Sequence, residues 1–188
     1  MNRKLVLSFG RFNPPTIGHQ KLIEACESVA NENRCDYKIY ISNSVDKEKN
    51  PLKTSDKLWF MHQMFPKYAN HIFADTEILN PFLLLAKYTK DYDDVIFIAG
   101  SDRVSEYETR FNKHMNGNTA TFFYLSLVVQ SSGERDADSE GATGMSASKM
   151  RAAAESMDLI SFRKGIPKTL KRPEMMMLFN AVREGMGL

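Results

Sequence analysis

One stretch of the chain decides the fold, Gly10-Arg11-Phe12-Asn13-Pro14-Pro15-Thr16-Ile17-Gly18-His19, and it directly follows the apolar run Leu5–Phe9. Gly10 permits an abrupt turn of the backbone, and each proline keeps the residue before it extended rather than helical. Thr16 is placed to cap a helix, and Gly18 keeps a side chain out of the space above the first turn. The stretch therefore predicts a strand that turns sharply into a helix.

The start of that helix has the chemistry of an anion site. Its first backbone N–H groups have no partner within the helix, and the helix dipole adds partial positive charge. His19 can add a hydrogen-bond donor at the same position. The alternative interpretation is a plain strand–turn–helix corner with an incidental histidine. Glycine, proline, threonine and histidine together at one strand end favour phosphate binding.

Apolar residues follow two different periods along the rest of the chain. They recur at helical spacing from Leu22 to Val29, whereas Asp94–Ala99 contains the compact apolar run of a buried strand. Further strands are predicted at Leu5–Phe9, Tyr37–Ser42, His71–Ala74 and Ala120–Val129, and further helices at Thr54–Phe65, Phe82–Lys90, Ser105–Met115, Ser146–Met157 and Leu170–Glu184. This alternation predicts an α/β fold, with a mainly parallel sheet, helices on both of its faces and a helical C-terminus.

The length of 188 residues fits one domain. We expect the domain to cover residues 1–165, with residues 166–188 as a helical extension of it. The polar, acidic stretch Gln130–Gly144 is predicted to be a loop, at a length where loops tend to be functional or mobile.

The composition excludes several classes of protein. With 43% hydrophobic and 26% charged residues the chain is globular rather than disordered. A net charge of +2 gives no global attraction to nucleic acid, so an anionic ligand must be bound by local charge. The two cysteines form no CxxC pair, and no metal site built from protein ligands alone is expected. No apolar run approaches the roughly 20 residues that span a bilayer, and we expect a cytoplasmic protein.

Two further segments offer groups that bind nucleotides. Gly100-Ser101-Asp102-Arg103 follows the most apolar strand, and Asp102 could contact ribose, substrate or a hydrated metal ion; a plain β-turn is the alternative. Ser146 is a plausible helix cap, and Arg151 follows it by about one and a half turns. An arginine fork grips phosphate oxygens in a way that lysine cannot reproduce. A solvated arginine on an exposed helix is the alternative there.

Two of these segments resemble one family. Gly10–His19 matches the signature G-x-F-x-P-x-[TH]-x-G-H of the nucleotidyltransferase α/β-phosphodiesterase superfamily, whose fold is Rossmann-like and doubly wound. Gly144–Arg151 resembles the superfamily motif I-S-[ST]-[ST]-x-[IL]-R, in which a helix start and its arginine hold the β- and γ-phosphates. Ala147 stands where that motif often has a hydroxyl residue, so one phosphate contact is missing or is supplied by Ser148.

A third segment resembles one branch of that superfamily. Asn50–Lys57 is similar to the N-P-F-T-x-x-E-R stretch of archaeal-type nicotinamide mononucleotide adenylyltransferases. There, residues that precede and open a helix help to bind substrate phosphate. The resemblance implies that Lys53 and Lys57, together with Asn13, bind the acceptor, although Lys57 replaces the usual arginine. Solvated lysines at a helix start are the alternative.

The resemblance implies transfer of a nucleoside monophosphate, with AMP from ATP favoured, to a phosphate-bearing acceptor such as nicotinamide mononucleotide, with release of pyrophosphate. Mg²⁺ would arrive bound to the triphosphate, and a homo-oligomer is a further expectation. The residues expected to act in catalysis are Thr16, His19 and Arg151; those expected to bind the nucleotide are Gly10, Arg11, Phe12, Gly18, Gly100, Asp102, Ser146 and Ser148. Cytidylyl transfer to a polyol- or sugar-phosphate is the nearest alternative, and a nucleotide-binding module without turnover is an alternative of another class.

Overall fold

The sheet has five strands, all parallel to their neighbours, in the order β3-β2-β1-β4-β5. The computed structural model describes residues 2–116, 119–133 and 144–188. The strands are β1 (Lys4–Gly10), β2 (Asp36–Ile41), β3 (Ile72–Ala74), β4 (Asp94–Ala99) and β5 (Ser126–Ser131). The order reverses at β1, which lies between β2 and β4, and such a reversal is where open α/β sheets bind their ligands.

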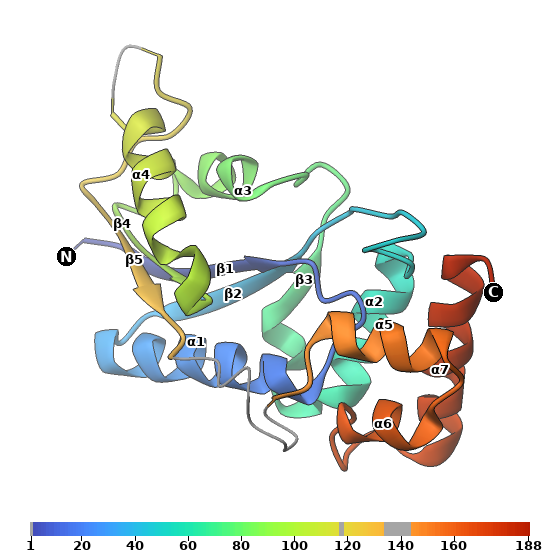
Figure 1. Cartoon of the computed structure of the whole chain (residues 1–188). Coiled ribbons are helices and arrows are strands. Elements are labelled where there is room, and N and C mark those ends of the chain that lie inside the picture. The colour runs from blue at the N-terminus through green and yellow to red at the C-terminus, as the bar shows by residue number, and fades with distance from the viewer. Residues whose placement is uncertain (1, 117–118, 134–143) are drawn as a thin grey trace.

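Successive side chains of β1 enter two different cores, because side chains alternate between the two faces of a strand. Val6 belongs to one core, and Leu5 and Leu7 belong to the other; all three are fully buried. The predicted α/β fold with helices on both faces of a parallel sheet is therefore confirmed (Figure 1).

The helices divide between the two faces of the sheet. The face that includes Val6 is covered by α1 (Gln20–Asn33) and α2 (Thr54–Met64), and α5 (Ala147–Glu155), α6 (Leu159–Lys164) and α7 (Arg172–Met186) pack into the same core beside them. The opposite face is covered by α3 (Pro81–Tyr88) and α4 (Val104–His114). Three short 3₁₀ turns complete the described elements: η1 (Ile17–His19), η2 (Pro66–His71) and η3 (Ser101–Arg103). No helix in these parts of the chain is long and apolar enough to cross a membrane.

The last strand begins later than its sequence predicts. A strand was expected over Ala120–Val129, but β5 covers Ser126–Ser131. The preceding residues are held by Asn116 instead, whose side-chain amide donates to Tyr124 O at 2.7 Å and accepts from Tyr124 N at 3.0 Å. At Tyr124, hydrogen bonds to the Asn116 side chain thus take the place of hydrogen bonds to a neighbouring strand. Of the loop predicted over 130–144, residues 134–143 lie outside the described residues, and residues 130–131 belong to β5.

Helix ends also differ from their predicted positions. The helix expected to reach Phe65 ends at Met64, because Pro66 disfavours helical backbone at the residue before it. The helix expected to reach Met157 ends at Glu155, and Met157 has a positive φ of 59°. The helix α6 was not predicted from the sequence; it begins where Asp158 accepts a hydrogen bond from Ser161 N at 2.9 Å.

The C-terminal part of the chain packs into the same core as α1 and α2. Leu178, Phe179 and Val182 of α7 are buried in it. The predicted boundary at residue 165 falls at the end of α6, where the carbonyl of Gly165 accepts a hydrogen bond from Ile17 N at 2.8 Å. The division at that residue stays a prediction, but the described C-terminal helices are attached directly to the turn after β1.

One glycine sets how closely α7 approaches the segment before α2. A Cβ on Gly185 would overlap the carbonyl oxygen of Pro51, which is backbone and has little freedom to move. Alanine normally stabilises a helix relative to glycine by about 1 kcal/mol. We expect the reverse here: Gly185→Ala lowers the free energy of unfolding by about 1–3 kcal/mol, because the overlap forces the helix outward.

Urea denaturation followed by circular dichroism measures this change. Glu184→Ala, at the exposed neighbouring position of the same helix, is the matched control and should lie within about 0.5 kcal/mol of the wild type. A Gly185→Ala variant as stable as the wild type would contradict the close approach.

Candidate active site

A cavity of about 630 Å³ lies over the carboxyl ends of four strands. Gly10 of β1 lines it, as do Ser42, Gly100 and Ser132, which directly follow β2, β4 and β5. Its volume is within the range of small-molecule sites, and it lies at the reversal of strand order. The predicted site residues that line it are Gly10, Arg11, Phe12, Asn13, Gly18, His19, Gly100, Asp102, Ser146, Ser148 and Arg151. Thr16, Lys53 and Lys57 are not among the lining residues.

The sharp exit of β1 depends on the ring of Phe12. Phe12 has a φ of 46° and is 2% exposed, so its side chain folds back under the corner. A Cβ on Gly10 would lie 2.6 Å from Cε2 of that ring, which explains the glycine. The ring also packs edge-on against His19, with 4.9 Å between centroids. Phe12 thus supports the cavity floor from beneath.

His19 is held by the backbone of the same corner. Its Nδ1 accepts a hydrogen bond from Thr16 N at 2.9 Å, and Thr16 Oγ1 lies 3.3 Å from the same atom. Because Nδ1 acts as an acceptor, the neutral ring carries its proton on Nε2. Thr16 is 1% exposed and His19 8%. Thr16 therefore fixes the orientation and the tautomer of His19, and the imidazole is the member of this pair that lines the cavity.

Asn13 braces the corner against the segment before α2. Its Nδ2 donates to Leu52 O at 3.1 Å, and its Oδ1 accepts from Leu52 N at 2.9 Å. Asn13 is 2% exposed. Both ends of the amide are thus engaged by Leu52, and the acceptor-binding role expected for Asn13 stays a prediction.

Arg151 joins α5 to the corner. Its Nη1 donates to Asn13 O at 2.8 Å, and its Nη2 donates to Ser148 Oγ at 3.2 Å. Burial, and then the positive charge of Arg11, lower the pKa of Arg151 from its ordinary value. Arg11 and Arg151 both line the cavity. Ser146 caps α5 as predicted and accepts from Lys149 N at 3.1 Å.

Positive charge is concentrated around the cavity, although the whole chain carries only +2. Among the described lining residues Asp102 is the one carboxylate, against six basic side chains: Arg11, Lys21, Lys49, Arg103, Arg110 and Arg151. Low-dielectric walls focus such a charge imbalance and raise the local concentration of anions. The cavity therefore suits a ligand with several negative charges.

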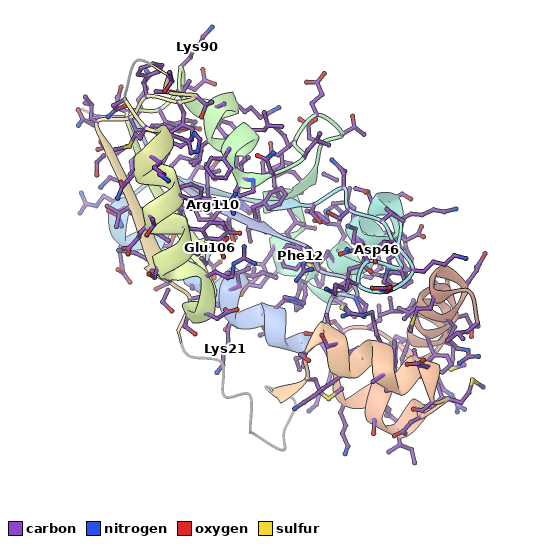
Figure 2. The ribbon with its side chains drawn as sticks, turned by 45° about the horizontal axis from the view of Figure 1, so that its top comes forward. Phe12, Lys21, Asp46, Lys90, Glu106 and Arg110 are labelled. Carbon is purple, nitrogen blue, oxygen red and sulfur yellow. The ribbon has the colours of Figure 1, made fainter. Side chains whose placement is uncertain are left out.

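Two arginines that line the cavity were not predicted as site residues: Arg103, which ends η3, and Arg110 of α4. Both pair with Glu106 of α4, at 2.8 Å and 2.9 Å. The hydrogen bond from Arg110 is the main cause that lowers the pKa of Glu106. The guanidinium of Arg110 also lies 5.1 Å from the ring centre of Phe82. Glu106 and Arg110 both project from α4, and Phe12 lies apart from them, toward α2 (Figure 2). The sequence does contain a signal for these residues: Arg103, Glu106 and Arg110 recur at i, i+3 and i+7 shortly after Gly100.

The two lysines expected to bind the acceptor take other positions. Lys53 is exposed at the start of α2. Lys57 is fully buried, and its Nζ donates to the carbonyl oxygens of Ser42 and, at 3.3 Å, of Ser44. Burial lowers the pKa of Lys57 from 10.5 to about 8. The ammonium group of Lys57 therefore faces the chain's own backbone, and the acceptor-binding role expected for this residue stays a prediction.

The described residues contain no group of three or more His, Cys, Asp or Glu side chains that could hold a metal ion. Asp102 is a single carboxylate at the cavity. Such a donor set fits a magnesium ion whose other ligands are phosphate oxygens and water, since Mg²⁺ commonly binds through one or two carboxylates and substrate phosphates.

Comparison with solved structures agrees with the fold. The chain is similar in structure to the crystal structure of Thermotoga maritima TmcAL in its apo form, with a TM-score of 0.52 and 10% sequence identity. The similarity covers 97% of this chain but only 57% of that protein, and at this identity it concerns the fold alone. No curated protein sequence is similar enough to count as a match.

The family comparison is more specific. Residues 7–152, which are more than half of the chain, match the family described as cytidylyltransferase-like. The matched range begins inside β1 and ends inside α5, so it includes both the Gly10–His19 corner and Arg151. The chain belongs to the cytidylyltransferase-like family of nucleotidyltransferases.

Proposed function

We propose that this nucleotidyltransferase transfers AMP from ATP to a phosphate-bearing acceptor such as nicotinamide mononucleotide and releases pyrophosphate. One observation carries the assignment: six basic side chains and one carboxylate surround a cavity that is bounded by the β1 corner and the start of α5. Two phosphate-bearing substrates need such an excess of positive charge. The choice of nicotinamide mononucleotide rests on the resemblance of Asn50–Lys57.

The reaction requires alignment and charge rather than a protein nucleophile. An oxygen of the acceptor phosphate attacks the α-phosphorus of the triphosphate, a new P–O bond forms, and the bond to the β-phosphate breaks. His19 donates from Nε2 to the α- and β-phosphate oxygens as negative charge shifts onto the leaving group. Ser146, Ser148 and Arg151 hold the β- and γ-phosphates. The rigid corner supplies the alignment.

Magnesium bound to the triphosphate would neutralise charge on the leaving pyrophosphate. Among the described residues that line the cavity, Asp102 has the carboxylate that would approach the hydrated ion or the ribose. The side chains of the protein would then align the two substrates, whereas the ion would arrive bound to the nucleotide.

Cytidylyl transfer to a polyol- or sugar-phosphate is the second candidate, and the family match favours it, because its description is cytidylyltransferase-like. A nucleotide-binding module without turnover is the third, since Ala147 removes one hydroxyl group from the phosphate-binding helix start. All three share the same triphosphate site; the first two differ in the product, and the third forms none.

A substrate grid tests the proposal. Each of four nucleoside triphosphates is mixed with nicotinamide mononucleotide, phosphopantetheine or a polyol phosphate, and pyrophosphate and product mass are measured. We expect the mixture of ATP and nicotinamide mononucleotide to give pyrophosphate and a dinucleotide product. EDTA should abolish the formation of both products, and excess Mg²⁺ should restore it. A product from CTP instead would select the second candidate. Binding of triphosphate without pyrophosphate in every mixture would select the third.

Two substitutions at His19 separate its structural role from its chemical role. His19→Asn keeps an acceptor near the position of Nδ1 for Thr16 N but loses the Nε2 donor, whereas His19→Ala loses both. We expect kcat to fall by about 10²–10³ in both variants, because the donor at the transition state is lost in both. His19→Ala alone should also lose thermal stability. Steady-state kinetics and thermal melting measure the two effects, and near-normal kcat in His19→Asn would remove the imidazole from the mechanism.

Arg151→Lys tests the fork at the triphosphate end. A lysine keeps the positive charge but cannot contact Asn13 O, Ser148 Oγ and phosphate at the same time. We expect KM for the triphosphate to rise about tenfold or more, with a smaller effect on KM for the acceptor. Arg183→Lys is the control, because Arg183 donates to Ala154 O and does not line the cavity. Equal kinetics of Arg151→Lys and the wild type would overturn the assignment.

A further inference from the structure

The segment Ser42–Ser44 forms the part of the cavity wall that follows β2. Ser42 and Ser44 both line the cavity. Ser42 N donates to Gly10 O at 2.8 Å, so the segment begins against the end of β1. Asn43 Nδ2 donates to Asp75 O at 2.6 Å and ties the middle of the segment to the chain after β3. The wall is thus held from both neighbouring strand ends.

Lys57 holds the same segment from behind. Its ammonium group contacts two carbonyls that are two positions apart, those of Ser42 and Ser44. Lys57 is fully buried and does not line the cavity. A buried ammonium group is costly unless it is hydrogen-bonded, and these two backbone carbonyls supply that compensation. Two carbonyls that converge on one cation fix the path of the chain between them.

Ser42 has a feature that points to a ligand. The residue is 2% exposed and lines the cavity, yet its hydroxyl has no hydrogen-bond partner among the residues that the structure describes. Buried hydroxyl groups are normally paired, since an unpaired one loses its interaction with water without compensation. A bound molecule with a polar group would supply the missing partner.

The place of Ser42 indicates which substrate that is. In the proposed reaction the triphosphate occupies the β1 corner and α5, and Asp102 after β4 approaches the ribose or the ion. β2 lies on the other side of β1 from β4. The wall after β2 is therefore one part of the cavity that these nucleotide contacts leave open, and the acceptor must occupy a position next to the α-phosphate.

We infer that Lys57 is a positioning residue, which holds Ser42–Ser44 so that the Ser42 hydroxyl hydrogen-bonds to the acceptor. The acceptor half of this inference rests on the proposed function. The role differs from direct phosphate binding, which the similarity of Asn50–Lys57 to other nucleotidyltransferases implies for this position. Here the cation acts on the substrate through the backbone of the cavity wall.

Hydrogen–deuterium exchange without any substrate tests the positioning role. In Lys57→Met we expect the Ser42 amide, which is bonded to Gly10 O, to exchange at least tenfold faster than in the wild type. Met64→Ala, at a buried position of the same helix, controls for general loss of stability, and Lys90→Met controls for removal of an exposed lysine far from the cavity (Figure 2). An unchanged Ser42 amide in Lys57→Met, or equal acceleration in Met64→Ala, would overturn the positioning role.

Kinetics with the substrate pair found in the grid test the acceptor contact. Ser42→Ala should raise KM for the acceptor about three- to tenfold, the effect of one hydrogen bond, and leave triphosphate affinity unchanged. Lys57→Met should lower kcat/KM for the acceptor about 10²-fold, as expected when a wall shifts by about 1 Å. A Ser42→Ala variant with wild-type KM for the acceptor, or with altered triphosphate affinity only, would refute the contact.

Lys57→Arg separates the two roles of the cation. A direct phosphate ligand would tolerate arginine, which is the usual residue in the resembling motif. A fully buried positioning lysine has no room for the larger guanidinium, so we expect fast exchange at Ser42 and a raised KM for the acceptor. Wild-type kinetics in Lys57→Arg would refute positioning. If no mixture in the grid gives product, the proposed function and the acceptor contact fail together, while the exchange experiment still decides the role of Lys57.

Discussion

The hydrogen bond from Arg151 to the carbonyl of Asn13 is the constraint on which the rest of the site depends. Asn13 is a point where three parts of the chain meet. Asn13 itself belongs to the corner after β1. Its side-chain amide is hydrogen-bonded to Leu52, which precedes α2, and its backbone carbonyl accepts the hydrogen bond from Arg151 of α5. The segment next to Leu52 is in turn packed against α7 at Gly185. The cavity thus has walls from distant parts of the sequence, and one asparagine connects them.

Much of the fold follows from local sequence. The apolar run of Asp94–Ala99 and the spacing from Leu22 to Val29 give the correct elements, because side-chain period is set by the backbone geometry of each element. The corner after β1 was also predictable, since glycine and proline restrict the backbone wherever they stand. The prediction of the superfamily is confirmed by the family match, while the resemblance to nicotinamide mononucleotide adenylyltransferases in particular stays a prediction.

The missing parts of the site depend on contacts between segments. Lys57 has the same local sequence whether its ammonium group points to phosphate or to Ser42 O, and only the packing of α2 against β2 decides between them. Arg110 lines the cavity because of where α4 packs in the fold, which the spacing of charges along the helix does not by itself specify. Phe12 illustrates the same point: this motif residue lines the cavity, yet its side chain is 2% exposed and packs against Gly10. Sequence predicts which groups are present more reliably than it predicts their partners.

The separation between Asn13 and Arg151 has a consequence for biosynthesis. They are 138 positions apart, so ribosomes that add roughly 5–20 residues per second need on the order of ten seconds to make the second after the first. During that interval the β1 corner exists on the nascent chain without its brace. A polypeptide released early, before α5 is complete, would contain the most recognisable motif of the protein and yet lack the assembled cavity. The described cavity can therefore be assembled only after α5 has been made.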